Sequence, residues 1–107
     1  MTESNSRSVT ELTMADTGRW RVTTRTSTHY LDLDARTTVR VPGASADPTI
    51  NDRSRPLRSI EVCRVGESGR WTMHAEGSDR DDVDFFWAIT SEIRSIEKDD
   101  AHRAANQ

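Results

Sequence analysis

Alternation of apolar and polar residues is the clearest pattern in the chain, and it is densest between Arg19 and Val41. Within "RWRVTTRTSTHYLDLDARTTVRV", three consecutive runs carry an apolar residue at every second position. Period-two patterning with β-branched and aromatic residues is typical of half-buried strands. The stretch therefore predicts three antiparallel strands that share one buried face. The residues expected on that face are Trp20, Val22, Leu31, Leu33, Val39 and Val41.

The register of these strands can be predicted from their turns. Turns at 26–27 and 35–37 would place Asp32 between Arg21 and Arg40 on the exposed face. Cross-strand pairs of opposite charge contribute only ~0.2–1 kcal/mol each. Their main effect would be to specify the register, because a slip of one residue moves every side chain to the other face.

Three further strands are expected beyond a long loop. Residues 42–56 contain all three prolines of the chain and several Asp and Ser residues, which is typical of a loop. Residues 57–65 and 70–75 form a hairpin about the glycine-flanked turn at 66–69, and 83–90 alternates again. The core residues expected from these strands are Ile60, Val62, Trp71, Met73, Phe85, Trp87 and Ile89.

The last ordered segment, residues 90–98, has two interpretations. Ile89, Ile93 and Ile96 have helical spacing, and Thr90 and Ser91 could cap a helix that runs to Asp99. The other interpretation, which we favour, is a seventh strand around Glu92–Ile96. The sequence therefore predicts an all-β fold, a six- to seven-stranded antiparallel meander that forms a small barrel or roll. The alternative is the same sheet with one C-terminal helix.

Length and composition predict one small domain. The chain has 107 residues, a length typical of one domain. Only 33% of its residues are hydrophobic, compared with the usual ~45–50%, so few residues are available to form a core. The N-terminal residues 1–17 are Ser/Thr/Glu-rich and are expected to be a disordered tail, and 98–107 a polar C-terminal tail. The β domain then spans 18–97, and its size implies modest stability or help from a partner subunit.

Net charge, cysteine content and the N-terminal sequence narrow the expected partners and the expected cellular location of the protein. A net charge of −3 does not favour nucleic acid, whose partners usually present a strongly basic face. The single cysteine, Cys63, excludes an internal disulfide. The N-terminus resembles neither a signal peptide nor a membrane span, so we expect a cytoplasmic protein that does not associate with a membrane.

No motif in the sequence points to catalysis, a cofactor or a metal. The acidic run Asp79, Asp81, Asp82 and Asp84 lacks the glycine and the glutamate of a calcium-binding EF-hand loop, so a solvated loop is the expected role. The histidines (His29, His74, His102) and Cys63 lack zinc-ligand spacing. The chain also has no Gly-rich phosphate loop and no G-x-S-x-G elbow, so we expect no enzyme, no cofactor and no metal site.

Two features are candidates for binding. The exposed face of the first three strands would collect basic residues around one aromatic ring, as surfaces that bind single strands do, although Asp32 and Asp34 would neutralise part of it. The second feature is Phe86, which would point outward opposite Phe85 and Trp87 and would need a cover, either a helix or a second copy of the chain. The candidate residues are Arg19, Arg21, Arg25, Tyr30, Arg40 and Phe86.

Four stretches carry a resemblance to a known group: "WRVTT", "STHYLDLDARTTVRVPG", "IEVCRVG" and "TSEIRSIE". Together they resemble uncharacterised small all-β proteins of actinobacteria and their phages, over residues 19–97. The long 42–56 segment and the aromatic "DFFW" depart from that pattern. The resemblance implies an all-β fold, and it implies no activity and no catalytic or binding residues.

These observations lead to two functional hypotheses. The first is a non-enzymatic protein-interaction module, such as a phage or host accessory protein that binds and modulates a larger protein. Its partner could also be a second copy, which would make it a homodimer. The alternative is a small barrel that binds single-stranded nucleic acid through the arginine face.

Overall fold

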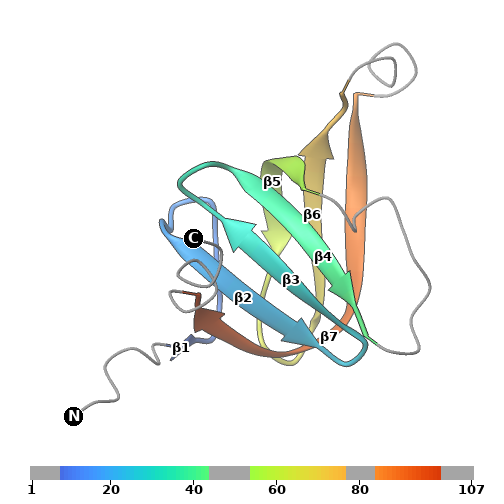
Figure 1. The fold of residues 1–107 in the computed structure, drawn as a ribbon. Coiled ribbons are helices and arrows are strands. Elements are labelled where there is room, and N and C mark those ends of the chain that lie inside the picture. The colour runs from blue at the N-terminus through green and yellow to red at the C-terminus, as the bar shows by residue number, and fades with distance from the viewer. Residues whose placement is uncertain (1–7, 44–53, 77–83, 100–107) are drawn as a thin grey trace.

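The computed structural model describes residues 8–43, 54–76 and 84–99, and these residues form seven strands and no helix (Figure 1). The predicted all-β fold is confirmed, and so is the strand interpretation of residues 90–98. The strands are β1 (Ser8–Val9), β2 (Arg19–Thr24), β3 (Ser27–Asp32), β4 (Thr37–Pro42), β5 (Arg55–Val62), β6 (Ser68–His74) and β7 (Phe85–Lys98).

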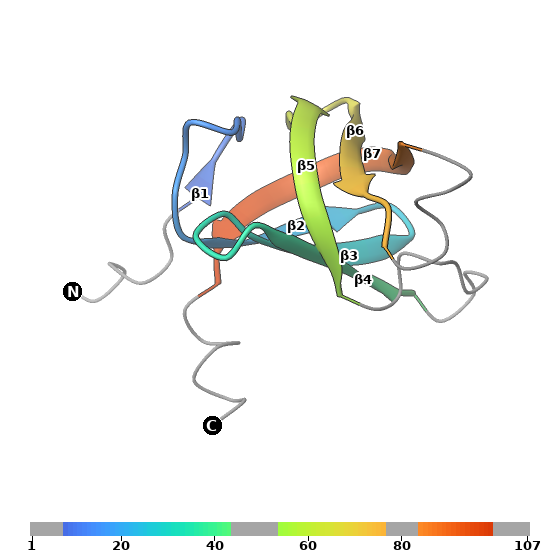
Figure 2. The same cartoon turned by 90° about the horizontal axis from the view of Figure 1, so that it is seen from above.

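The strands are antiparallel and their pairing closes on itself. The order is β1-β7-β2-β3-β4-β5-β6, and an additional pairing of β7 with β6 joins six of the strands into a ring. The 14-residue strand β7 makes this closure possible, because its first half pairs with β6 and its second half with β2. Figure 2 shows β7 curving from the neighbourhood of β2 to that of β6. The ring encloses one core.

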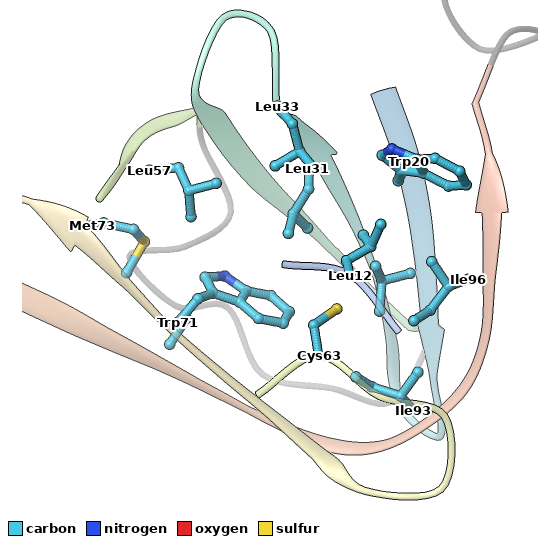
Figure 3. Packing of buried hydrophobic residues seen from close by; sticks show 12 residues of the cluster. Leu12, Trp20, Leu31, Leu33, Leu57, Cys63, Trp71, Met73, Ile93 and Ile96 are labelled. Atoms are coloured by element: carbon cyan, nitrogen blue, oxygen red, sulfur yellow. The ribbon is translucent and has the colours of Figure 1, made fainter. Parts of the chain in front are cut away.

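The core is built from strands on all sides of the ring. Figure 3 shows its side chains pointing toward one another, with Trp71 among them. Trp71 is fully buried, and its indole meets the His29 ring in a T-shaped contact with the centroids 5.2 Å apart. The buried apolar residues are Leu12, Trp20, Val22, Leu31, Leu33, Leu57, Cys63, Trp71, Met73, Ala88, Ile93 and Ile96.

The β2–β3 hairpin has the predicted faces but a shifted register. Its inward residues are the predicted ones, with Trp20 opposite Leu31. The turn comes one residue earlier than expected, so Asp32 pairs with Arg19 instead of Arg21. This shift moves each partner by two residues, and an even shift keeps every side chain on its face.

Strand β4 presents the opposite face to the one predicted. Asp32 pairs with Thr37 and not with Arg40, a shift of three residues, and an odd shift exchanges the faces. Thr38 is consequently buried, while Val41 is 49% exposed. The cause is a longer turn after β3, in which Arg36 adopts a positive φ of 60°.

The first half of β7 is also reversed. Trp71 of β6 pairs with Ala88, and since cross-strand partners share a face, Ala88 is buried while Trp87 and Ile89 are 44% and 67% exposed. A small residue opposite Trp71 leaves room for the buried indole. Phe86, expected to be exposed, is therefore the one that packs against the core.

Irregular registers explain the remaining core differences. The β5–β6 pairing shifts twice, so that Leu57 and Cys63 are buried while Val62 is only partly so. Cys63, which is not among the expected core residues, is 1% exposed, and this burial raises the pKa of its thiol to about 12. The thiol is thus a small apolar core group and not a nucleophile.

The ends of the domain extend beyond the predicted limits. β1 pairs with β7, and Leu12 is 1% exposed with its N–H donated to the Cys63 carbonyl, so 8–17 belongs to the fold and is not a tail. Lys98 ends β7 and Asp99 is buried. Most of the expected 42–56 loop and the acidic residues Asp79, Asp81 and Asp82 lie outside the described residues.

Candidate interaction surface

The predicted arginine face exists, but ion pairs occupy its centre. Arg19 Nε lies 3.0 Å from Asp32 Oδ2, and Arg21 pairs with Glu97 of β7. The hydrogen bond with Glu97 raises the pKa of Arg21. Burial, the largest single effect on Asp32, acts to raise the pKa of its carboxyl. Hydrogen bonds from Ala35, Arg19 and Asp34 outweigh it, so that pKa is lowered.

The other predicted members do not complete this surface. Tyr30 lies across from Arg21 and is half-buried. Arg25 follows the end of β2, where its backbone N–H donates to the Glu92 carbonyl at 3.1 Å. Arg40 is on the same side of β4 as buried Thr38, away from the Arg19 and Arg21 surface. The structure thus brings together two of the four predicted arginines and the tyrosine.

Phe86 does not form an exposed site either. Its ring packs against the core and lies under the guanidinium of Arg55, whose Cζ is 5.0 Å from the ring centroid. Arg55 is only 2% exposed. Arg55 is therefore buried and Phe86 partly buried, so the expected outward-pointing Phe86 is not found.

The outer face of β5, β6 and the first half of β7 carries a different cluster, which we call the aromatic–arginine face. It exposes Trp87 and Ile89, two of the four large apolar residues exposed among the described ones. Phe85 lies beside Trp87 in a T-shaped contact, with the ring centroids 5.9 Å apart. The members of the aromatic–arginine face are Arg58, Arg70, Phe85, Trp87 and Ile89.

The two arginines of this face stack on its aromatic rings. Arg58 Cζ lies 4.2 Å from the Phe85 centroid, and Arg70 Cζ lies 5.0 Å from the Trp87 centroid. The sheet register produces this arrangement, because β6 places Arg70 beside Ile89 and diagonal to Trp87. Contacts of this kind contribute ~0.5–1 kcal/mol at exposed sites. Neither arginine forms an ion pair with any carboxylate in the described parts of the chain.

A chain of hydroxyl groups holds Arg58 in place. Its Nη1 is 3.4 Å from Thr72 Oγ1, which lies 2.6 Å from Ser59 Oγ, and that hydroxyl donates to Glu61 Oε2 at 2.9 Å. Each hydroxyl has one proton, so Thr72 donates to Ser59 and accepts from Arg58. The guanidinium is thus anchored on a neutral oxygen and not on a carboxylate.

A small polar cavity of about 130 Å³ lies at the β2–β3 turn. Ser27 Oγ and His29 Nε2 are 3.0 Å apart at this cavity, a spacing that nucleophilic catalysis would also need. Ser27 Oγ is also 3.1 Å from Thr24 Oγ1, which donates to the Ser27 carbonyl, and both residues are buried. These hydroxyls secure the hairpin turn. Within the residues that the structure covers, no group of side chains could hold a metal ion.

Alternation alone could not reveal the aromatic–arginine face, because it shows which residues share a face and not which face is buried. The pairing of β7 with β6 and its pairing with β2 each contain a register shift. These shifts change which side of β7 points into the core along its length. Thr90, Ile93 and Ile96 are buried as a result, each three residues from the next. A spacing of three between buried residues of one strand indicates a β-bulge, and this spacing can be recognised in the sequence.

Comparison with known proteins identified no relative of this chain. No protein-family model, curated protein or solved structure matches this chain. None of the described segments forms a helix of the length and apolarity needed to cross a membrane.

Proposed function

We propose that the protein is a non-enzymatic protein-interaction module and that the aromatic–arginine face binds its partner. The observation that carries this proposal is the exposure of Trp87 (44%) and Ile89 (67%) beside two arginines that have no carboxylate partner among the described residues. Tryptophan and arginine are the residue types most enriched among the few that dominate binding energy. The centres of interfaces are also depleted of other charged residues.

The rest of the molecule is compatible with this role. The described residues form one small β domain, and the buried Cys63 thiol, with its raised pKa, is unreactive. A module of this kind acts by occupying a surface of a larger protein. We therefore propose a phage or host accessory protein that modulates such a partner.

Two matched variants test the proposal in a pull-down from host lysate treated with nuclease. Ile89→Asp places a charge at the most exposed apolar member of the aromatic–arginine face, while Val41→Asp places the same charge at an exposed β-branched residue of β4. We expect a stoichiometric protein partner to be retained by wild type and by Val41→Asp and lost by Ile89→Asp. Retention by Ile89→Asp, or equal loss in both variants, would contradict the proposal.

Binding of single-stranded nucleic acid is the second candidate. It is favoured by the interleaving of arginine and aromatic side chains, which many single-strand binders share. Against it stand the net charge of −3 and the guanidinium groups that cover one face of each ring. Loss of all captured material on nuclease treatment would favour it, as would an affinity that falls steeply with salt.

A further inference from the structure

We infer that the partner of the aromatic–arginine face is an extended acidic segment that presents carboxylates at alternate positions to Arg58 and Arg70. This inference rests on the proposed function and names the chemistry of the partner. It follows from three features of the face: the missing counter-charges, the aromatic rings beneath the guanidinium groups, and the spacing of those rings.

The missing counter-charges distinguish these two arginines from four others on strands and turns. Arg19, Arg21, Arg64 and Arg94 each lie within 4.0 Å of a carboxylate oxygen. Arg58 and Arg70 are exposed and have aromatic rings beneath them where these four arginines have an acid. Their positive charge therefore remains available to a partner.

The rings beneath the two guanidinium groups also restrict how these groups meet a ligand. A guanidinium lying on a ring directs its N–H groups to the side, and this planar fork matches a carboxylate bidentately. Arg58 is held further by its hydrogen bond with Thr72. Because the side chains are ordered before binding, little conformational entropy is lost on association.

The spacing of the rings matches an extended chain. Phe85 and Trp87 are two residues apart on β7, with their centroids separated by 5.9 Å. Alternate side chains of a strand repeat at about 6.6 Å. A segment with Asp or Glu at positions i and i+2 would thus place one carboxylate at each guanidinium, and an apolar residue at i+4 would reach Ile89.

A protein segment fits this face better than a phosphate backbone does. Ile89 is the most exposed large apolar side chain of the described residues, and it lies next to Arg70 in the register. An aliphatic side chain provides contact area for an apolar residue of a peptide and no stacking surface for a base. An acidic peptide is therefore the ligand class, and a single strand is the competing outcome of the test.

The experiment is an NMR titration of the full chain with capped peptides, observed at the Trp87 indole N–H. The probe Ac-TETETLT-NH2 carries the proposed pattern, and Ac-TQTQTLT-NH2 is its uncharged match. We expect a saturable shift with the glutamate peptide and binding about tenfold weaker with the glutamine peptide. Arg58→Gln with Arg70→Gln should reduce the glutamate peptide to the glutamine level, whereas Arg94→Gln should not.

Other outcomes of these experiments would contradict the inference. Equal binding of both peptides, or no shift up to about 10 mM glutamate peptide, would overturn the inference. Saturable binding of a short oligothymidylate in place of the peptides would assign the face to nucleic acid. A lysate partner lost with Ile89→Asp but retained by the Arg58→Gln, Arg70→Gln variant would keep the proposed function and refute only the acidic segment.

Discussion

The outer faces of β2–β3 and of β5–β6–β7 both carry arginines, yet the arginines have different surroundings. On the first face, Arg19 and Arg21 pair with Asp32 and Glu97 across neighbouring strands. On the second, Arg58 and Arg70 lie on Phe85 and Trp87 with no ion pair in the described residues. In the first arrangement carboxylates neutralise the charge of the arginines, and in the second the guanidinium charge stays available.

This difference separates a structural role from a role in recognition. An ion pair between cross-strand neighbours has already satisfied its charges, so a partner would have to break it before binding. A guanidinium stacked on a ring keeps its N–H edge accessible. Arginine content therefore says less about a binding surface than the group that each arginine contacts.

The largest expected effect on the free energy of unfolding comes from Trp71 of β6, and Trp87 of the paired strand β7 is the residue to compare with it. Trp71→Ala should destabilise the protein by ~3–5 kcal/mol, because it empties the centre of the core. Trp87→Ala should cost only about 1–2 kcal/mol, since the indole is 44% exposed and contributes one cation–π contact and one T-shaped contact with Phe85. Urea unfolding followed by circular dichroism measures both. Similar losses would mean that Trp87 is a core residue, as alternation predicted, and would remove the aromatic–arginine face.

The ion-paired face should depend on Asp32. Its carboxylate accepts from Arg19 and from the N–H groups of Asp34 and Ala35, so Asp32→Ala should cost ~1–3 kcal/mol. The pKa of Asp32 is lowered by folding from its ordinary value of 3.8. This contribution is therefore complete above that pH and is lost as the pH falls below it.

The control for Asp32 is the pair of variants Arg58→Gln and Arg70→Gln on the other face. Together they should change the free energy of unfolding by no more than about 1–2 kcal/mol, since each removes one exposed cation–π contact. They should also leave the acid branch of the pH–stability curve unchanged. A similar loss of acid dependence in these variants would show that the two faces do not differ as described.

A smaller effect is expected in the turn that orients β4. Arg36 has a φ of 60°, a conformation that costs a residue with a Cβ about 1–2 kcal/mol and glycine nearly nothing. Arg36→Gly should stabilise the protein by about 0.5–1 kcal/mol after the greater flexibility of glycine in the unfolded chain is included. The melting temperature measures this, with Arg25→Gly as a control in the preceding turn. A destabilised Arg36→Gly would show that the turn has another conformation.

The smallest effect concerns the Arg21–Glu97 pair. Both side chains are about two-fifths exposed, at 36% and 40%, so Arg21→Ala should cost only ~0.2–1 kcal/mol. The cost should shrink in high salt, where exposed charges are screened. A double-mutant cycle with Glu97→Ala isolates the pair, and a coupling that does not respond to salt would argue against an ion pair.

The candidate surface was only partly predictable from the sequence. Alternation correctly grouped Arg19, Arg21 and Tyr30 on one exposed face, since neighbours on a strand must alternate whatever the fold. It could not show that Glu97 neutralises Arg21, because 76 residues separate the two. It placed Phe86 outside and Trp87 inside, because both choices satisfy the same alternation.

The sequence by itself determined where most of the strands lie and, between bulges, which of their residues share a face, because the two-residue period of side chains is a local property of extended backbone. Tertiary structure decided which of the two faces is buried. In β4 the decision came from the length of the turn before it, and in β7 from the fit of Ala88 against Trp71. Both depend on the register between strands, and a single residue of register exchanges the inside and the outside of a strand.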